Sequence, residues 1–134
     1  MNSKSSSVSR IRILMEINGI GEFDCEFIRH LSPLTIATIL RKLPISGMLH
    51  TRGAHMKYIE TGFNVGAEKQ KAFFDKADVT YMTSNGSICI ILQSTSGILM
   101  NPVGKFLGDI ESFTSAPPGA VLTINTIKKT VDKN

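Results

Sequence analysis

Hydrophobic and polar residues alternate over the first ordered part of the chain, with the period of two that is typical of half-buried strands. The alternation runs from Arg10 to Ile17, and after a turn at Asn18–Gly21 it resumes in a return strand. The apolar positions of the two strands are Ile11, Ile13, Met15, Ile17, Phe23, Cys25 and Phe27. The opposite positions are basic on the first strand (Arg10, Arg12) and acidic on the second (Glu22, Asp24, Glu26). The pattern therefore predicts a hairpin with cross-strand ion pairs, each contributing about 0.2–1 kcal/mol.

A second pattern centres on Ile88–Leu92, an unbroken apolar run that is too short for a helix and suits a strand buried on both faces. It follows Asn85-Gly86, a pair that favours a tight hairpin turn in which both central residues have positive φ. With Val79–Thr83 as the partner strand, these residues predict a hairpin at the centre of the core.

Between the two hairpins the spacing becomes helical. Ser32-Pro33 is typical of a helix start, with Ser as the N-cap, and Pro44 ends the helix. The apolar face of this helix consists of Ile36, Ile39, Leu40 and Leu43. Short strands are expected at Met48–Thr51 and Met56–Ile59, around a turn at Thr51–Ala54.

The rest of the chain is divided by polar and glycine-containing stretches. Gly66–Asp78 is expected to be a loop or short helix, and Gln93–Asn101 a flexible loop. The remaining predicted elements are a strand at Val103–Gly108, a short helix at Asp109–Phe113 and a final strand at Val121–Ile127. We therefore expect a flexible leader at 1–9, one domain at 10–129 and a C-terminal tail at 130–134.

Composition limits the class of protein. A chain of 134 residues can bury a substantial core without staples. The net charge of +4 comes largely from basic residues near the two ends, and no basic run is interleaved with aromatic residues, so a nucleic-acid partner is not expected. The longest purely apolar run is far shorter than the ~20 residues of a membrane helix, and no signal peptide is evident, which predicts a cytoplasmic protein. Cys25 and Cys89 fall at apolar-facing positions and are expected to be buried thiols.

Two motifs carry a resemblance to a known family. Ser84–Ile91, SNGSICII, is similar to the TNGSQFFI turn and strand of the cyclophilins, and Val103–Ile110 resembles their FGKVVEGMDV pattern. A family of small prokaryotic cyclophilin-like domains, with no assigned activity, is more similar still. Its pattern is a helix ending in LP, a TWG-like turn, a GDVxYWP-like strand and an NPVGK-like strand. This sequence offers Leu43-Pro44, Thr51–Gly53, Ala77–Met82 and Asn101–Lys105 in that order.

The resemblance covers about Arg10 to Lys129. It implies a mainly β fold, a closed cyclophilin-like β-barrel of about eight strands with one main helix and one short helix. It also implies prolyl cis/trans isomerisation, which cyclophilins achieve with an arginine beside an apolar proline pocket. The catalytic pattern FHRIIPGFMIQGG corresponds here to Leu49–Gly62 with a shift of one residue at Arg52. Lys57 then occupies the position of the pocket phenylalanine and Glu60 that of the glutamine.

A cation in place of an apolar wall disfavours a proline ring, and Ile88, Cys89 and Ile90 replace further polar and aromatic positions of the pattern. The leading hypothesis is therefore a binding domain that recognises a peptide segment or a small ligand in a surface groove, with an isomerase using Arg52 as the alternative. The groove is predicted to be bordered by Arg52, His55, Tyr58, Phe63, Tyr81 and Met100. Arg52 would hold a carboxylate or a carbonyl. Tyr58, Phe63 and Tyr81 could equally belong to the barrel core.

A third hypothesis is an assembly unit that self-associates through Ile98, Leu99 and Met100. No cofactor is expected. His30, His50 and His55 match no metal-binding spacing, so no metal site is expected either.

Overall fold

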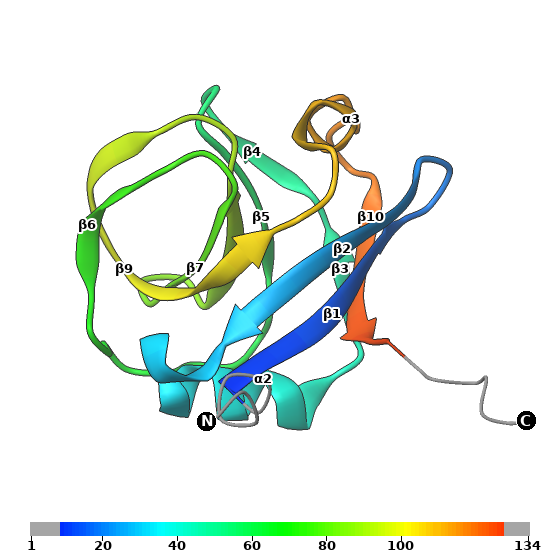
Figure 1. Ribbon diagram of the computed structural model, residues 1–134. Coiled ribbons are helices and arrows are strands. Elements are labelled where there is room, and N and C mark those ends of the chain that lie inside the picture. Colours follow the sequence, from blue (N-terminus) through cyan, green and yellow to red (C-terminus); the bar gives the residue numbers. More distant parts are fainter. Residues whose placement is uncertain (1–8, 128–134) are drawn as a thin grey trace, which may run out of the picture.

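The computed structural model describes residues 9–127 and shows a mainly β fold with two α-helices (Figure 1). The helices are α2 (Pro33–Lys42) and α3 (Ile110–Thr114), and a 3-10 turn, η1 (Arg29–Leu31), precedes α2. The strands are β1 (Arg10–Ile17), β2 (Gly21–Ile28), β3 (Ile45–Met48), β4 (His50–Arg52), β5 (Met56–Glu60), β6 (Lys71–Phe74), β7 (Asp78–Met82), β8 (Ser87–Ile91), β9 (Thr95–Phe106) and β10 (Val121–Thr126).

All pairings between these strands are antiparallel, in the order β3-β10-β1-β2-β9-β7-β8-β5-β4, with β6 added to β9. The sheet curls strongly, with α2 at one end and α3 at the other (Figure 1). In residues 9–127 no ladder joins the terminal strands β3 and β4, so the predicted closed barrel of about eight strands is wrong: ten strands form an open sheet.

The ends of the sheet stay unpaired because the segment between β3 and β4 is bonded elsewhere. The amide of Leu49 donates to the carbonyl of Ala120 (2.8 Å), and the Leu49 carbonyl accepts from Gly119 (3.1 Å). Gly47 of β3 nevertheless packs against β5, where a Cβ at Gly47 would lie 3.4 Å from the Cβ of Ile59. Side-chain packing therefore closes the core where backbone hydrogen bonds do not.

The predicted β1–β2 hairpin is confirmed, with Ile13 opposite Cys25 and Met15 opposite Phe23. On its outer face Arg10 pairs with Glu26 (2.6 Å) and Arg12 lies 3.7 Å from Asp24. Both ion pairs run diagonally across the ladder, because Arg10 faces Ile28 and Arg12 faces Glu26. The cross-strand ion pairs that the alternation predicts are therefore present on this face.

The β7–β8 hairpin is also confirmed, and β8 is buried on both faces. Ile88 and Ile90 point into the main core, whereas Cys89 and Ile91 join a second cluster with Met56, Phe74, Met82 and Met100. Alternate side chains of one strand therefore serve two separate clusters. The fully apolar pattern of β8 follows from this position.

The turn of this hairpin differs from the prediction. The pair Met82 and Ser87 closes a four-residue loop in which Gly86 has φ 65°, while Asn85 is not in the positive-φ region. The amide of Gly86 donates to the Met82 carbonyl (3.0 Å). A Cβ at Gly86 would lie 2.6 Å from the Phe63 carbonyl oxygen, so this position requires glycine for both its backbone angle and its space.

Helix α2 matches its prediction, but its N-cap does not. Ser32 makes no side-chain capping bond. The carboxylate of Glu68, from the loop before β6, accepts from the amides of Leu34 (2.9 Å) and Thr35 (2.8 Å) and from the Thr35 hydroxyl (2.8 Å). Asn101 of β9 holds this loop, because its side chain accepts from the Glu68 amide (2.9 Å) and donates to Thr35 Oγ1 and to the Gly66 carbonyl (both 3.0 Å).

Two predicted loops contain strands instead. Gly66–Asp78 contains β6, and Gln93–Asn101 contains the first half of the long strand β9, which pairs with β6. This ribbon covers the second cluster with Phe74 and Met100. Of the residues proposed for self-association, Met100 is buried, Ile98 is partly buried against the cluster and Leu99 alone is exposed, so the three do not form one surface patch.

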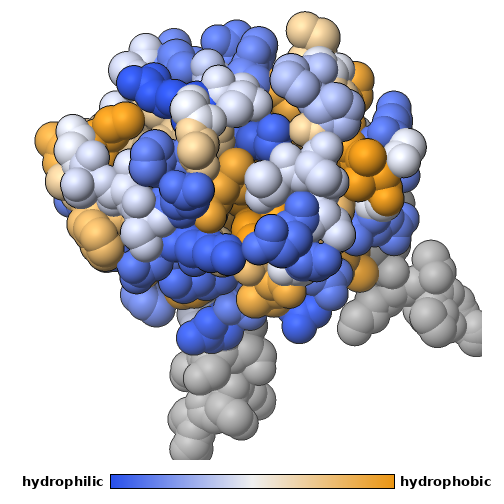
Figure 2. Space-filling view, turned by 90° about the horizontal axis from the view of Figure 1, so that it is seen from above, coloured by the Kyte–Doolittle hydropathy of each residue, from blue (hydrophilic) through white to orange (hydrophobic). Residues whose placement is uncertain are grey.

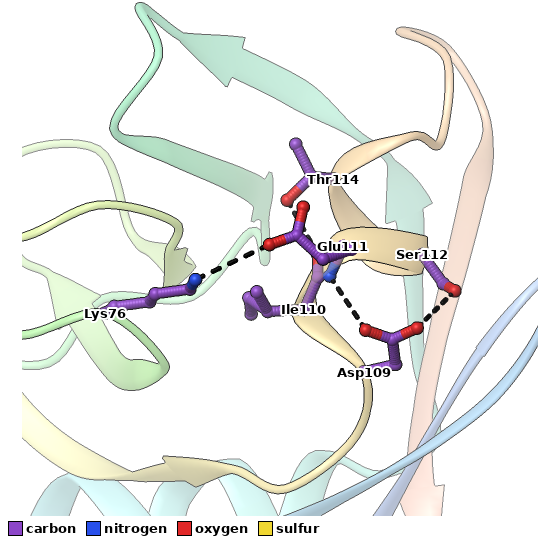
Figure 3. Close-up of polar contacts among 6 residues, drawn as sticks. All are labelled: Lys76, Asp109, Ile110, Glu111, Ser112 and Thr114. Carbon is purple, nitrogen blue, oxygen red and sulfur yellow. Dashed lines mark hydrogen bonds and ion pairs between the residues drawn. The ribbon is translucent and has the colours of Figure 1, made fainter.

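The short helix α3 and the final strand β10 agree with the prediction. Asp109 caps α3 by accepting from the Glu111 amide (3.1 Å) and the Ser112 hydroxyl (2.8 Å), as Figure 3 shows. Glu111 also lies 3.5 Å from Lys76, which follows β6, so the helix is tied to the β6–β7 connection. The predicted leader and tail fall largely on residues 1–8 and 128–134, which lie outside the described residues.

Candidate functional site: a cleft between η1, β6, β7 and β9

The predicted groove residues do not come together. Arg52 and His55 are exposed at the β4–β5 turn. Tyr58 is partly buried, and its ring stacks on His50 with centroids 5.2 Å apart. The His50–Tyr58 pair lies at the end of the β4–β5 ladder away from the turn that carries Arg52 and His55. The structure gives Arg52 no hollow to border among the clefts described below.

The other three predicted residues are mostly structural. Tyr81 and Met100 are both 0% exposed and belong to different clusters, so neither borders a surface groove. The Tyr81 hydroxyl donates to the Phe63 carbonyl and accepts from the Val65 amide, both at 3.0 Å. Phe63 stacks against Tyr81 with centroids 6.2 Å apart. Of the three aromatic residues for which a place in the core was the alternative, Tyr81 belongs to the core and Phe63 packs against it.

The residues aligned with the isomerase pattern differ in burial: Lys57 is buried, whereas Arg52 and Glu60 are exposed. Lys57 is only 4% exposed, and its amino group donates to Thr51 Oγ1 (3.2 Å) and to the Ala116 carbonyl (3.1 Å). Burial lowers the pKa of Lys57, because the charged ammonium loses its solvation. In the described part of the chain no carboxylate lies within ion-pair distance of it. Glu60 is exposed at the end of β5. The isomerase hypothesis stays a prediction.

A better-formed hollow lies elsewhere, between η1, β6, the start of β7 and the second half of β9. Its volume is about 200 Å³. Its lining residues combine apolar walls with four charged side chains: Ile28, Leu31, Lys71, Phe74, Asp75, Asp78, Val79, Pro102, Gly104 and Lys105. We call this hollow the β6–β9 cleft. Apolar walls with a few placed polar groups are typical of ligand sites.

Two of the resembling motifs meet in this cleft. Asp78 and Val79 belong to the stretch similar to the GDVxYWP-like strand, and Lys105 ends the NPVGK-like stretch. The two strands pair directly, with Asp78 opposite Lys105, and their side chains form an ion pair at 2.5 Å. The segments that carry the resemblance therefore build one wall of the cleft together.

The ion pair leaves part of its hydrogen-bonding capacity for a ligand. The Asp78 side chain is 12% exposed and also accepts from the Asp75 amide (2.8 Å), so it is largely occupied. The Lys105 side chain is 49% exposed. An ammonium group has three donors and Asp78 takes one, which leaves Lys105 able to bind an anionic group.

Gly104 shapes the wall beside Lys105. A Cβ at this position would overlap with the carbonyl oxygen of Glu26 on the neighbouring strand β2. Only glycine therefore lets β2 and β9 approach this closely. On the opposite wall the Lys71 amino group lies 5.5 Å from the centre of the Phe74 ring.

Two other hollows are more open. One of about 500 Å³ lies between the β1–β2 turn and α3 and includes Glu22, Asp24 and Asp109. Asp109 and Asp24 already have the partners described above. Figure 2, which shows the molecule from above the α3 end, has its apolar atoms in separate small areas among hydrophilic ones. The third hollow, of about 270 Å³, is lined by residues of the α2–β3 and β5–β6 connections.

Within residues 9–127 no group of three or more His, Cys, Asp and Glu side chains is placed to hold a metal ion. Cys25 and Cys89 are free buried thiols, and burial raises the pKa of Cys89 to about 12. No helix of the described residues is long and apolar enough to cross a membrane.

Part of the cleft has a signal in the sequence. Asp78 and Lys105 lie within motifs that the resemblance already singled out, and strand pairing brings them together. The sequence gives no such signal for η1, and β6 lies in the segment Gly66–Asp78 that the sequence predicts to be a loop or short helix.

Comparison with known proteins bears on the fold. No protein-family model matches the chain, and a search of curated proteins gives no match. Solved structures do match: the chain shares a mainly β fold with proteins of very different sequence.

One such structure is the solution structure of the hypothetical protein AF2241 from Archaeoglobus fulgidus, with a TM-score of 0.75 and 19% identity over 89% of this chain and 96% of that one. Another is McbB in complex with tryptophan, with a TM-score of 0.70 and 14% identity over 85% of this chain. The matched region is only 44% of the McbB chain. Identities this low establish the fold alone, and the cyclophilin-like resemblance stays a prediction.

Proposed function

We propose that this chain is a binding domain that takes a small ligand, or the end of a peptide, in the β6–β9 cleft. The observation that carries the proposal is the cleft itself: apolar walls from Leu31, Phe74 and Pro102 beside the half-exposed ammonium of Lys105. An apolar group would fill the hollow while a carboxylate contacts Lys105.

The size of the cleft limits the ligand. Its volume of about 200 Å³ is below the roughly 300–1,000 Å³ of pockets that enclose drug-sized molecules. A ligand on the scale of one amino acid is therefore favoured over a long peptide. The McbB neighbour, whose structure contains tryptophan, suggests aromatic amino acids as the first class to test.

The chain contains no tryptophan, so added L-tryptophan can be excited selectively at the red edge of its absorption, where the two tyrosines absorb little. The test is a fluorescence-anisotropy titration of L-tryptophan with the protein, compared with N-acetyltryptophanamide, which lacks both charges. We expect saturable binding of L-tryptophan and at least tenfold weaker binding of the uncharged analogue, because Lys105 then has no carboxylate to contact.

Two matched variants localise the binding. Leu31→Phe places a larger side chain at the cleft, whereas Leu34→Phe adds the same volume at a residue that is 71% exposed on α2 and does not line the cleft. Binding weakened at least tenfold by Leu31→Phe and unchanged by Leu34→Phe supports the proposal. Equal binding by both variants contradicts the assignment to this cleft. Absence of saturable binding by L-tryptophan, phenylalanine and short peptides with a free carboxylate contradicts the proposed function.

A further inference from the structure

Strand β6 has a free edge. In residues 9–127 it pairs with β9 alone, and Figure 1 shows it at the margin of the molecule, with no strand beyond it. Such an edge exposes unpaired amide and carbonyl groups that can bond to another strand. Charged ends and a short length are the usual protection, and β6 has only four residues.

The outer surface of the β6–β9 ribbon is apolar at its centre. Phe73 on β6 is 54% exposed and Leu99 on β9 is 58% exposed. Their neighbours Phe74 and Met100 are buried beneath the ribbon in the second cluster. Because adjacent residues of a strand point to opposite faces, burying Phe74 and Met100 directs Phe73 and Leu99 outward.

Two residues of opposite charge flank Phe73 at equal spacing in the sequence. The sequence from 71 to 75 is Lys-Ala-Phe-Phe-Asp, with a cation two residues before Phe73 and an anion two residues after it. Both charged residues are exposed, and neither makes an ion pair within the described residues. Asp75 directly follows the last residue of β6, and the ladder to β9 is irregular between Lys71 and Phe73. Counted along the sequence, an antiparallel copy of this segment centred on Phe73 would place each lysine opposite an aspartate.

We propose that β6 pairs with β6 of a second copy of this chain, antiparallel and about a two-fold axis at Phe73. Such an isologous contact uses the same residues twice. It forms two Lys71–Asp75 pairs, one at each end, and one aromatic pair between the two Phe73 rings. Facing pairs of opposite charge and facing aromatic residues both stabilise antiparallel strands.

A second copy fits this edge better than an unrelated strand, because the required complement, with charges of opposite sign on each side of an apolar residue, is the segment itself. A contact along one short strand falls below the ~1,200–2,000 Å² of standard stable interfaces. The dimer is therefore weak, and the monomer predominates in dilute solution. The inference is independent of the proposed ligand, although Lys71 and Asp75 also reach the rim of the cleft.

The test is sedimentation-velocity and equilibrium ultracentrifugation of the ligand-free protein over a concentration series at low ionic strength. Lys71→Asp creates two Asp–Asp oppositions, and Asp75→Lys creates two Lys–Lys oppositions. Each variant alone is expected to weaken dimerisation at least tenfold. The double variant Lys71→Asp/Asp75→Lys restores opposite charges and is expected to recover the wild-type constant within about threefold.

An equimolar mixture of the two single variants is the sharpest arm, because every facing pair in the heterodimer is attractive. We expect the mixture to form heterodimers while each variant alone stays monomeric. Arg41→Asp on α2, an exposed charge reversal far along the chain from β6, serves as the control for net charge and should leave dimerisation unchanged. Circular dichroism verifies that each variant is folded.

A monomeric wild type at millimolar concentration contradicts the proposal. So does a dimer that both single variants leave intact, or a mixture and a double variant that fail to recover association.

Discussion

The capping of helix α2 by Glu68 gives the most quantitative test of the fold. The carboxylate accepts three hydrogen bonds, from the amides of Leu34 and Thr35 and from the Thr35 hydroxyl, at 2.8–2.9 Å. Loss of an N-cap costs about 0.5–2 kcal/mol, and a negative charge at a helix N-terminus contributes about 0.3–1 kcal/mol. We expect Glu68→Ala to lower the free energy of unfolding by about 1–3 kcal/mol.

Glu68→Gln separates the charge from the hydrogen bonds. The amide oxygen of glutamine can still accept from the helix, so the expected loss is smaller, about 1 kcal/mol. Burial alone would raise the pKa of Glu68, but the hydrogen bonds from Leu34 and Thr35 and the nearby charge of Lys69 outweigh it and lower the pKa below the ordinary value of 4.5. The ionised carboxylate is therefore favoured in the folded state.

A lowered carboxyl pKa makes its stabilisation dependent on pH. The contribution of the charge is fully present above the unfolded-state pKa and is lost as the pH falls through the folded-state value. Urea unfolding at pH 7 and at successively lower pH should show wild type and Glu68→Gln converging in acid. Glu60→Gln removes an exposed carboxylate from β5 and is the control.

The reasoning is refuted if Glu68→Ala and Glu60→Gln give the same unfolding free energy as wild type within about 0.3 kcal/mol. A difference between wild type and Glu68→Gln that is constant from pH 7 into acid would refute the electrostatic part of it.

Three further outcomes follow from buried groups. Gly104→Ala should lower the free energy of unfolding by about 2–4 kcal/mol in urea titrations, because its Cβ would overlap with the backbone of β2, whereas Gly66→Ala, with open space around it, should cost less than about 1 kcal/mol. Burial lowers the pKa of Lys57, so between the folded-state value and 10.5 the unfolded chain binds more protons than the folded chain, and the free energy of unfolding should rise with pH. Lys57→Met should abolish this rise. A pH profile of unfolding that is the same in wild type and Lys57→Met would contradict the buried charge of Lys57. Burial raises the pKa of both thiols, so Cys25 and Cys89 should react with Ellman's reagent only after urea is added, and rapid reaction of the native protein would contradict their burial.

Local pattern was sufficient for elements whose stability is decided by their own residues. The alternation in β1 and β2, the apolar run of β8 and the Asp109 cap of α3 all lie within short windows, and their interpretation is confirmed. Tyr81 faces Ile88 of β8, whose side chain points into the main core, which explains why Tyr81 is core and not groove.

Long-range choices could not be derived in the same way. The cap of α2 comes from Glu68, which is 33 residues from Thr35, and Ser32 offers the same chemistry locally. The ribbon of β6 and β9 brings together two polar segments that each resemble loops, and its stability depends on burying Phe74 and Met100 in the second cluster. The prediction of a closed barrel was wrong for a similar reason: the backbone of Leu49 bonds to Gly119 and Ala120, which are about 70 residues away in the sequence.

The most direct test of the central claim is a map of ligand-induced changes in the 1H–15N spectrum during titration with L-tryptophan. The proposed function predicts saturable shifts at the amides that line the β6–β9 cleft, including Leu31, Val79, Gly104 and Lys105. Shifts gathered instead around Arg52 and His55 would favour the groove predicted from the sequence. Shifts that fail to saturate, or that are spread without relation to the cleft, would contradict a binding site there.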